Sequence, residues 1–148
     1  MISLRSFTYK DTSSLKRYYS MDMTTTEIES MIDDWNTKTF DGKYSEFFAI
    51  TSGVNVVGVI SLYQHSENVI GIGPEVFKPY QRQGIGKAAM LLAMNKAKSK
   101  GYKIVSQIIR TNNIASIALH ESLGFETDSY RFINRHGNEI YIYLKLLV

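Results

Sequence analysis

A glycine-containing segment between two regular runs constrains this fold more than any other feature of the chain. Residues 69–77 have the pattern of a strand and residues 87–100 that of a helix, and between them lies Gln81-Arg82-Gln83-Gly84-Ile85-Gly86. The first amides of a helix have no intrahelical partner and carry partial positive charge, and glycines let an anion approach the backbone. Lys87 and Arg82 add full charges beside these amides. We therefore expect a phosphate-binding loop at the start of this helix.

The distribution of charge along the chain also favours an anionic ligand in the middle. The chain has 148 residues and a formal net charge of +3. Between Asn68 and His120 it carries eight basic residues and a single acid, Glu75, so the excess of acids lies in the flanks. A polyanionic ligand suits the middle segment and a cationic substrate suits the flanks. The alternative for the four lysines that follow Met94 is a solvated surface.

Composition limits the class of protein. With 44% apolar residues and no low-complexity tract, the sequence predicts one domain over residues 1–148. The absence of cysteine excludes disulfides and a cysteine nucleophile, and is typical of the reducing cytoplasm, where we expect the protein. No apolar run approaches membrane-spanning length and the charge is mild, so neither a membrane nor nucleic acid is expected as a partner. No metal is expected, because metal-ligand spacing is absent among His65, His120 and His136.

The hydrophobic pattern predicts an α/β chain with the element order βααβββαβαββ. Strands are expected at 2–7, 46–51, 56–64, 69–77, 104–109, 131–134 and 140–147, and helices at 12–19, 24–36, 87–100 and 115–123. Antiparallel strands come first and a βαβ crossover lies in the middle. We therefore expect a mixed, mostly antiparallel sheet flanked by helices.

Single residues refine this pattern. Thr24 is expected to cap the second helix, with Glu27 in its first turn. Pro74 is expected to force a bulge or a break in the hydrogen-bond ladder of its strand, because proline cannot donate to the ladder. An exposed strand at 140–147 can pair across a homodimer.

Two motifs together resemble a known family. Gln81-x-x-Gly84-x-Gly86 is followed, after a strand, by Asn113-Ile114-Ala115-Ser116-Ile117-Ala118-Leu119-His120-Glu121-Ser122-Leu123-Gly124-Phe125. These motifs, and the element order over nearly the whole chain, are similar to the GNAT superfamily of acyl-CoA-dependent N-acyltransferases. The resemblance implies a GNAT fold in which the strands 69–77 and 103–110 splay apart and admit acetyl-CoA as acyl donor.

The resemblance also implies contacts with acetyl-CoA. The loop amides would hold the pyrophosphate, the backbone at 76–78 would bind the pantetheine arm, and the end of the second strand would contact that arm from the other side. The residues that the resemblance assigns to acetyl-CoA are Val76, Phe77, Lys78, Gln81, Arg82, Gln83, Gly84, Ile85, Gly86, Lys87, Asn113 and Ser116.

Two residues are candidates for proton transfer. Many family members have, at the position of His120, a tyrosine that acts as general acid toward the CoA sulfur, and a histidine can take this role or accept the proton of the amine. Glu75 is the only carboxylate of the basic middle segment and the candidate base. Family glutamates usually lie where this chain has Gly71 and Ile72 or, in the ribosomal-alanine branch, Ile108. Both candidates can instead be structural.

The expected reaction moves an acetyl group from acetyl-CoA to a primary amine of a small molecule or peptide in a ternary complex, because no cysteine can carry it. Asp33, Asp34 and Trp35 can present negative charge and an aromatic face to the amine, or can form a solvated helix face. The other aromatic residues, which can line the acceptor site or belong to the core, are Tyr18, Tyr19, Tyr63, Tyr130 and Phe132.

Two other functions share parts of this sequence pattern. The segment from Gly84 to Ala89 fits the glycine pattern of a dinucleotide-binding domain. However, residues 79–83 separate it from the strand, and the next strand ends in Arg110 rather than in an acid. A non-catalytic module that binds CoA or a peptide on the same fold is the second alternative, and turnover with an amine distinguishes it from an enzyme.

Overall fold

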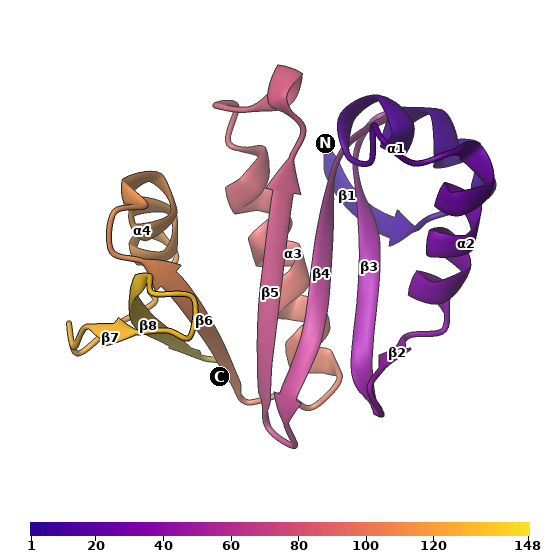
Figure 1. The fold of residues 1–148 in the computed structure, drawn as a ribbon. Coiled ribbons are helices and arrows are strands. Elements are labelled where there is room, and N and C mark those ends of the chain that lie inside the picture. The colour runs from indigo at the N-terminus through magenta and orange to yellow at the C-terminus, as the bar shows by residue number, and fades with distance from the viewer.

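An eight-stranded sheet runs through the molecule and separates two layers of helices (Figure 1). The computed structural model describes residues 1–148. The strands are β1 (Ile2–Ser6), β2 (Thr39–Phe40), β3 (Lys43–Ser52), β4 (Asn55–Ser66), β5 (Val69–Val76), β6 (Ile104–Arg110), β7 (Phe132–Ile133) and β8 (Glu139–Leu146). The helices are α1 (Thr12–Tyr18), α2 (Thr25–Asn36), α3 (Ile85–Ser99) and α4 (Ile114–Ser122), with short 3-10 turns at Tyr9–Asp11 and Lys78–Tyr80.

The order across the sheet is β1-β3-β4-β5-β6-β8-β7, with β2 paired to the start of β3. Only β5 and β6 run parallel, and α3 connects them. This confirms the predicted mixed, mostly antiparallel sheet with a central βαβ crossover. The short strand β2 was not predicted. None of the helices has both the length and the apolar composition needed to cross a membrane.

The predicted cap of α2 is present. The side chain of Thr24 accepts a hydrogen bond from the Glu27 N–H at 3.2 Å, and Glu27 Oε1 accepts one from the Thr24 N–H at 2.9 Å. This reciprocal pair satisfies two amides that the helix cannot satisfy itself. Ile28 and Ile32 are buried against the sheet, whereas none of the acidic side chains of α2 is buried.

Each face of the sheet has its own core. On one face α3 packs Met90 and Ala93 against residues of β4 and β5 such as Ile60 and Ile70. On the other face α1 and α2 cover a smaller cluster, in which Tyr18 stacks on Phe77 with ring centroids 5.2 Å apart. The central strands are therefore held rigidly from both sides.

The predicted bulge at Pro74 was wrong. Pro74 pairs with Ile60 in a regular antiparallel register, and the only shift between β4 and β5 falls between Gln64 and Ser66. The Ile72 N–H points toward β6, and by alternation the nitrogen of Pro74 points the same way, where no strand pairs with it. Proline therefore interrupts no ladder here, and Gly71, Gly73 and Glu75 share one face of β5.

The expectation of an exposed edge at β8 was also wrong. β8 lies between β6 and β7, and Glu126 pairs with Leu144 through two backbone hydrogen bonds on the side of β7. The segment after α4 thus returns along β8 and covers part of the side on which a second copy was expected to pair. The homodimer stays a prediction without this support.

The parallel strands β5 and β6 are paired only at their first residues. Val69 pairs with Ile104 and Ile70 with Val105, and beyond these pairs the two strands diverge (Figure 1). Backbone groups of both strands are left without a strand partner there, and the ends of α3 and α4 flank the opening.

Candidate functional site

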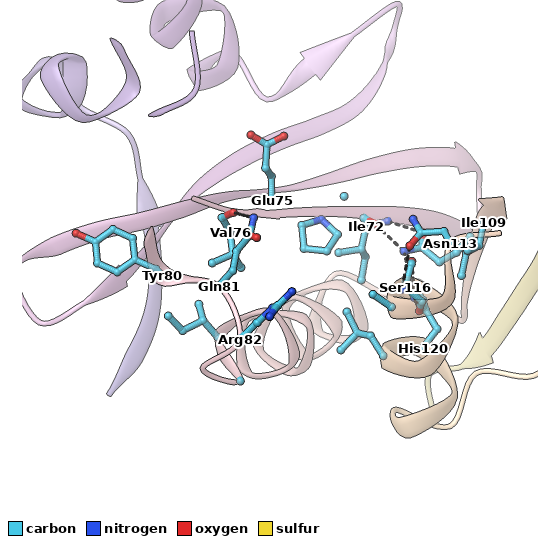
Figure 2. A pocket seen from close by; sticks show the side chains of 18 of the residues that line it. Ile72, Glu75, Val76, Tyr80, Gln81, Arg82, Ile109, Asn113, Ser116 and His120 are labelled. Atoms are coloured by element: carbon cyan, nitrogen blue, oxygen red, sulfur yellow. Dashed lines mark hydrogen bonds between the residues drawn. The ribbon is translucent and has the colours of Figure 1, made fainter. Parts of the chain in front are cut away.

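A cleft of about 770 Å³ opens where β5 and β6 diverge (Figure 2). Four parts of the chain line it: the second half of β5, the loop that leads into α3, the outer half of β6 and the first turns of α4. The residues that line it include Ile72, Gly73, Pro74, Glu75, Val76, Gln107, Ile108, Ser116 and His120.

A side chain closes the narrow end of this opening. Gln107 is 5% exposed; its Oε1 accepts a hydrogen bond from the Ile72 N–H at 2.9 Å, and its Nε2 donates to the Ile72 carbonyl at 2.6 Å. Further along β5, the Val76 carbonyl accepts from Gln81 Nε2 at 3.0 Å. By the alternation of the strand, the Val76 N–H also points into the cleft. The cleft therefore offers the backbone of Val76 to a ligand.

His120 lies in the last turn of α4, and both of its ring nitrogens contact protein groups. Its Nδ1 is 2.7 Å from the Ser116 carbonyl, and its Nε2 is 3.2 Å from Gln107 Nε2. A carbonyl only accepts, and the Gln107 nitrogen donates, so the ring carries its proton on Nδ1 and a lone pair on Nε2. Burial lowers the pKa of His120, while the hydrogen bond to Ser116 partly opposes this shift. The ring is therefore held neutral beneath the cleft.

The loop before α3 has the geometry of an anion site. Gly84 occupies the N-cap position with φ +76°, a conformation that favours glycine, and no side chain caps the helix. The first backbone bond of the helix runs from Ala88 N–H to the Gly84 carbonyl at 3.2 Å. The N–H groups of Ile85, Gly86 and Lys87 therefore have no partner in the chain. A Cβ at Gly86 would meet only a Val76 methyl group at 3.7 Å, so space for a ligand lies in front of these amides.

Glu75 projects from β5 to the side away from α3 (Figure 2). Its side chain is exposed, lines the cleft and forms no ion pair. Val59, which pairs with Glu75, packs in the cluster that α1 and α2 cover, so Glu75 lies on that face of the sheet. Burial, and then the charge of Glu75, raise the pKa of Tyr19. The structure thus brings Glu75 to the boundary between the cleft and that face.

A second cavity, of about 650 Å³, lies on the α2 side of the sheet. We call it the α2 cavity; it is lined by Met23, Glu27, Ser30, Met31, Asp34, Trp35, Thr39, Phe40, Ser45, Phe47, Ser61 and Tyr63. Tyr63 also lines the cleft, so the two hollows adjoin at this residue. The Tyr63 ring lies directly on Gly71, where a Cβ would overlap it, and burial raises the pKa of its phenol.

Most of the residues predicted for acetyl-CoA gather at the cleft. Those that line it are Val76, Gln81, Arg82, Gly84, Ile85, Gly86, Asn113 and Ser116, together with the catalytic candidates Glu75 and His120. Those that do not are Phe77, Lys78, Gln83 and Lys87. Phe77 is 1% exposed and belongs to the core beside Tyr18, so its side chain is not available to a ligand.

The residues suggested for the acceptor divide in the same way. Asp34, Trp35 and Tyr63 line the α2 cavity. The carboxylate of Asp33 instead accepts a hydrogen bond from the Tyr9 hydroxyl at 2.6 Å. Four of the suggested aromatic residues lie outside both hollows: Tyr18, Tyr19, Tyr130 and Phe132.

Sequence reasoning missed Gln107. It stands between Val105 and Ile109 at an inward position of β6, and all three side chains are buried. A polar residue at an inward position of an otherwise apolar strand was the signal, because a buried amide needs partners. Those partners, Ile72 and His120, come from other elements.

Comparisons with known proteins agree on one family. The model of the acetyltransferase (GNAT) family matches residues 12–125. The ribosomal protein bS18-alanine N-acetyltransferase of Escherichia coli strain K12 is 30% identical over 104 residues, which are 66% of this chain and 68% of that protein.

Solved structures share the fold at low identity. The putative acetyltransferase yncA from Salmonella typhimurium, solved with its cofactor acetyl-CoA, has a TM-score of 0.74 and 16% identity over 99% of this chain and 94% of its own. Mycobacterium smegmatis RimJ, in complex with CoA-disulfide, has a TM-score of 0.83 and 16% identity over 98% of this chain and 81% of its own.

Proposed function

Because the chain belongs to the GNAT acetyltransferase family and is an acetyl-CoA-dependent N-acetyltransferase, we propose that it acetylates a primary amine of a small molecule or peptide by direct transfer. The family resemblance drawn from the two sequence motifs is thereby confirmed. The observation that carries the proposal is the meeting of two hollows at Tyr63, with Glu75 at the same boundary. A donor in the cleft and an acceptor in the α2 cavity would meet at that boundary.

The donor is proposed to lie along the cleft. Its pyrophosphate accepts hydrogen bonds from the free amides of Ile85, Gly86 and Lys87, with the guanidinium of Arg82 beside them. The amide groups of the pantetheine arm bind the backbone of Val76, and Gln81 exchanges its bond to the Val76 carbonyl for the ligand. Asn113 and Ser116 contact the arm from the start of α4.

The chemistry needs an unprotonated amine and an exit for its proton. Glu75 accepts a proton from the ammonium group, directly or through water, because it is an exposed carboxylate with no ion-pair partner. The amine nitrogen then attacks the thioester carbonyl carbon and a tetrahedral intermediate forms. The carbon–sulfur bond breaks, the amide product keeps the acetyl group, and the CoA thiolate takes up the second proton, which the attacking nitrogen loses as it becomes an amide.

We assign a positioning role to His120. The direct acid or base role expected from the sequence would require the ring to leave the Ser116 carbonyl and Gln107. In the arrangement present, its Nε2 lone pair fixes the amide of Gln107, which in turn holds the backbone of Ile72 beside the place of the thioester. His120 thus acts on the reaction through Gln107.

Steady-state kinetics test this proposal. Release of the free CoA thiol is measured while acetyl-CoA and an amine are varied together. Direct transfer in a ternary complex predicts double-reciprocal lines that intersect, and parallel lines would instead indicate an acetyl-enzyme intermediate.

A further inference from the structure

Three residues paired across neighbouring strands form a row from the α2 cavity to the cleft. Phe47 on β3 pairs with Ser61 on β4, which pairs with Gly73 on β5. Adjacent strands lie about 4.8 Å apart, so this row spans about 10 Å. It ends at Gly73, which lines the cleft and has no side chain to block the passage. The next residue on the same face of β5 is Glu75.

The wall of the α2 cavity is negatively charged and aromatic. Glu27 and Asp34 line it, no lysine or arginine does, and neither carboxylate forms an ion pair. Glu27 already accepts a hydrogen bond from the Thr24 N–H. Its hydrogen bonds with Thr24, and to a smaller extent the charge of Lys16, lower its pKa. Asp34 has no hydrogen-bond or ion-pair partner for its carboxylate. Asp34 is therefore the carboxylate most available to a bound cation.

Aromatic faces complete this wall. Trp35 stacks on Phe47 with ring centroids 4.5 Å apart, and Phe40 is 76% exposed at the rim of the cavity. Aromatic faces beside free carboxylates attract organic cations, because the ring quadrupole and the negative charge act together. A neutral apolar tail would gain only from the rings, and an anionic tail would be repelled.

We propose that the α2 cavity selects an acceptor with two positive charges at the ends of an apolar chain, that is, a linear diamine or an equivalent organic dication. One amino group lies over Gly73 beside Glu75 and is acetylated. The apolar chain crosses Ser61 and Phe47, and the second cationic group lies beside Asp34. This inference rests on the proposed function, because an amine bound in the cavity is acetylated only if acetyl-CoA is bound in the cleft.

Three matched acceptors test the selection: 1,6-diaminohexane, hexylamine and 6-aminohexanoate, which differ only in the remote group. We expect kcat/KM for the diamine to exceed that for hexylamine about tenfold, and 6-aminohexanoate to be poorer still. Asp34→Asn lowers the ratio of the diamine value to the hexylamine value about fivefold. Asp33→Asn is the matched control, because Asp33 lies outside the cavity and bonds to Tyr9. Equal kcat/KM values for hexylamine and the diamine, or the same loss in both variants, would overturn the inference.

The only tryptophan of the chain gives a readout that does not depend on turnover. Trp35 lines the α2 cavity and does not line the cleft. We expect 1,6-diaminohexane to change its fluorescence in a saturable way, and 6-aminohexanoate to have no effect at the same concentration. A diamine that leaves the emission unchanged contradicts the proposed site.

Failure of this inference can be told from failure of the proposed function. An enzyme that binds acetyl-CoA and acetylates 6-aminohexanoate as well as the diamine retains the proposed function and loses the proposed selectivity. A protein that does not bind acetyl-CoA loses the proposed function, and with it the inference.

Discussion

Gln107 binds both the N–H and the carbonyl of Ile72, so a side chain takes the place of a strand partner where β5 and β6 begin to part. The bond crosses 35 residues of sequence and is buried. It satisfies two backbone groups that the divergence of the strands would otherwise leave without partners. The splay can therefore begin inside the core without an unsatisfied amide.

Replacement of Gln107 by Met keeps the volume of the side chain and removes these bonds. The buried N–H and carbonyl of Ile72 are then unsatisfied, and we expect the free energy of unfolding to fall by about 2–3 kcal/mol. Urea denaturation followed by circular dichroism measures the loss. Ser106→Ala, at the neighbouring position on the other face of β6, is the control. An unchanged midpoint in Gln107→Met would show that the bonds to Ile72 contribute nothing.

The neutral state of His120 predicts a dependence of stability on pH. Burial holds the pKa of the folded ring below its ordinary value of 6.5. As pH falls below 6.5, the histidine of the unfolded chain binds a proton that the folded chain does not bind. The free energy of unfolding therefore decreases with falling pH, until the pH reaches the lower pKa of the folded ring. We therefore expect the wild-type protein to lose stability between about pH 7.5 and pH 5.5 relative to His120→Asn, which has no ring to titrate.

Urea midpoints of the two proteins at both pH values provide this measurement. His65 and His136 are present in both proteins, so their titration cancels in the comparison. A difference between wild type and variant that is the same at both pH values contradicts the buried, neutral assignment.

Glu75→Gln tests the proposed base. We expect turnover to fall about 10²-fold or more, with unchanged affinity for acetyl-CoA, because the amide keeps the shape but cannot accept the proton. The deficit should shrink at high pH, where the amine is already unprotonated. Glu67→Gln, an exposed carboxylate in the turn between β4 and β5, is the control. Near-normal turnover in Glu75→Gln at neutral pH would assign the base to another group.

The order of the elements could be predicted because it depends on local patterns. The apolar runs of β3 and β4, the Thr24 cap and the glycine at position 84 all act within a few residues of sequence. The loop before α3, which we propose to bind phosphate, was predicted for the same reason. It requires only a strand, glycines and the start of a helix in sequence order.

The errors and omissions depend on which elements lie side by side. The bulge predicted at Pro74 assumed a partner on both sides of β5, and the divergence from β6 removes one of them. Gln107 and His120 were not connected, because their contact forms only when α4 packs beside β6. Tyr63 was proposed for the acceptor, but only the register of β4 against β5 places it between the two hollows.

The most direct test of the central claim is a calorimetric titration of acetyl-CoA into the wild-type protein and into Gly86→Trp. In the wild type we expect binding at one site, weakened by salt because phosphates contribute. The indole of Gly86→Trp fills the space before the α3 amides, so binding should be lost while the thermal midpoint of unfolding is retained. Wild-type affinity in Gly86→Trp would contradict the account, because the pyrophosphate would then bind somewhere other than the start of α3.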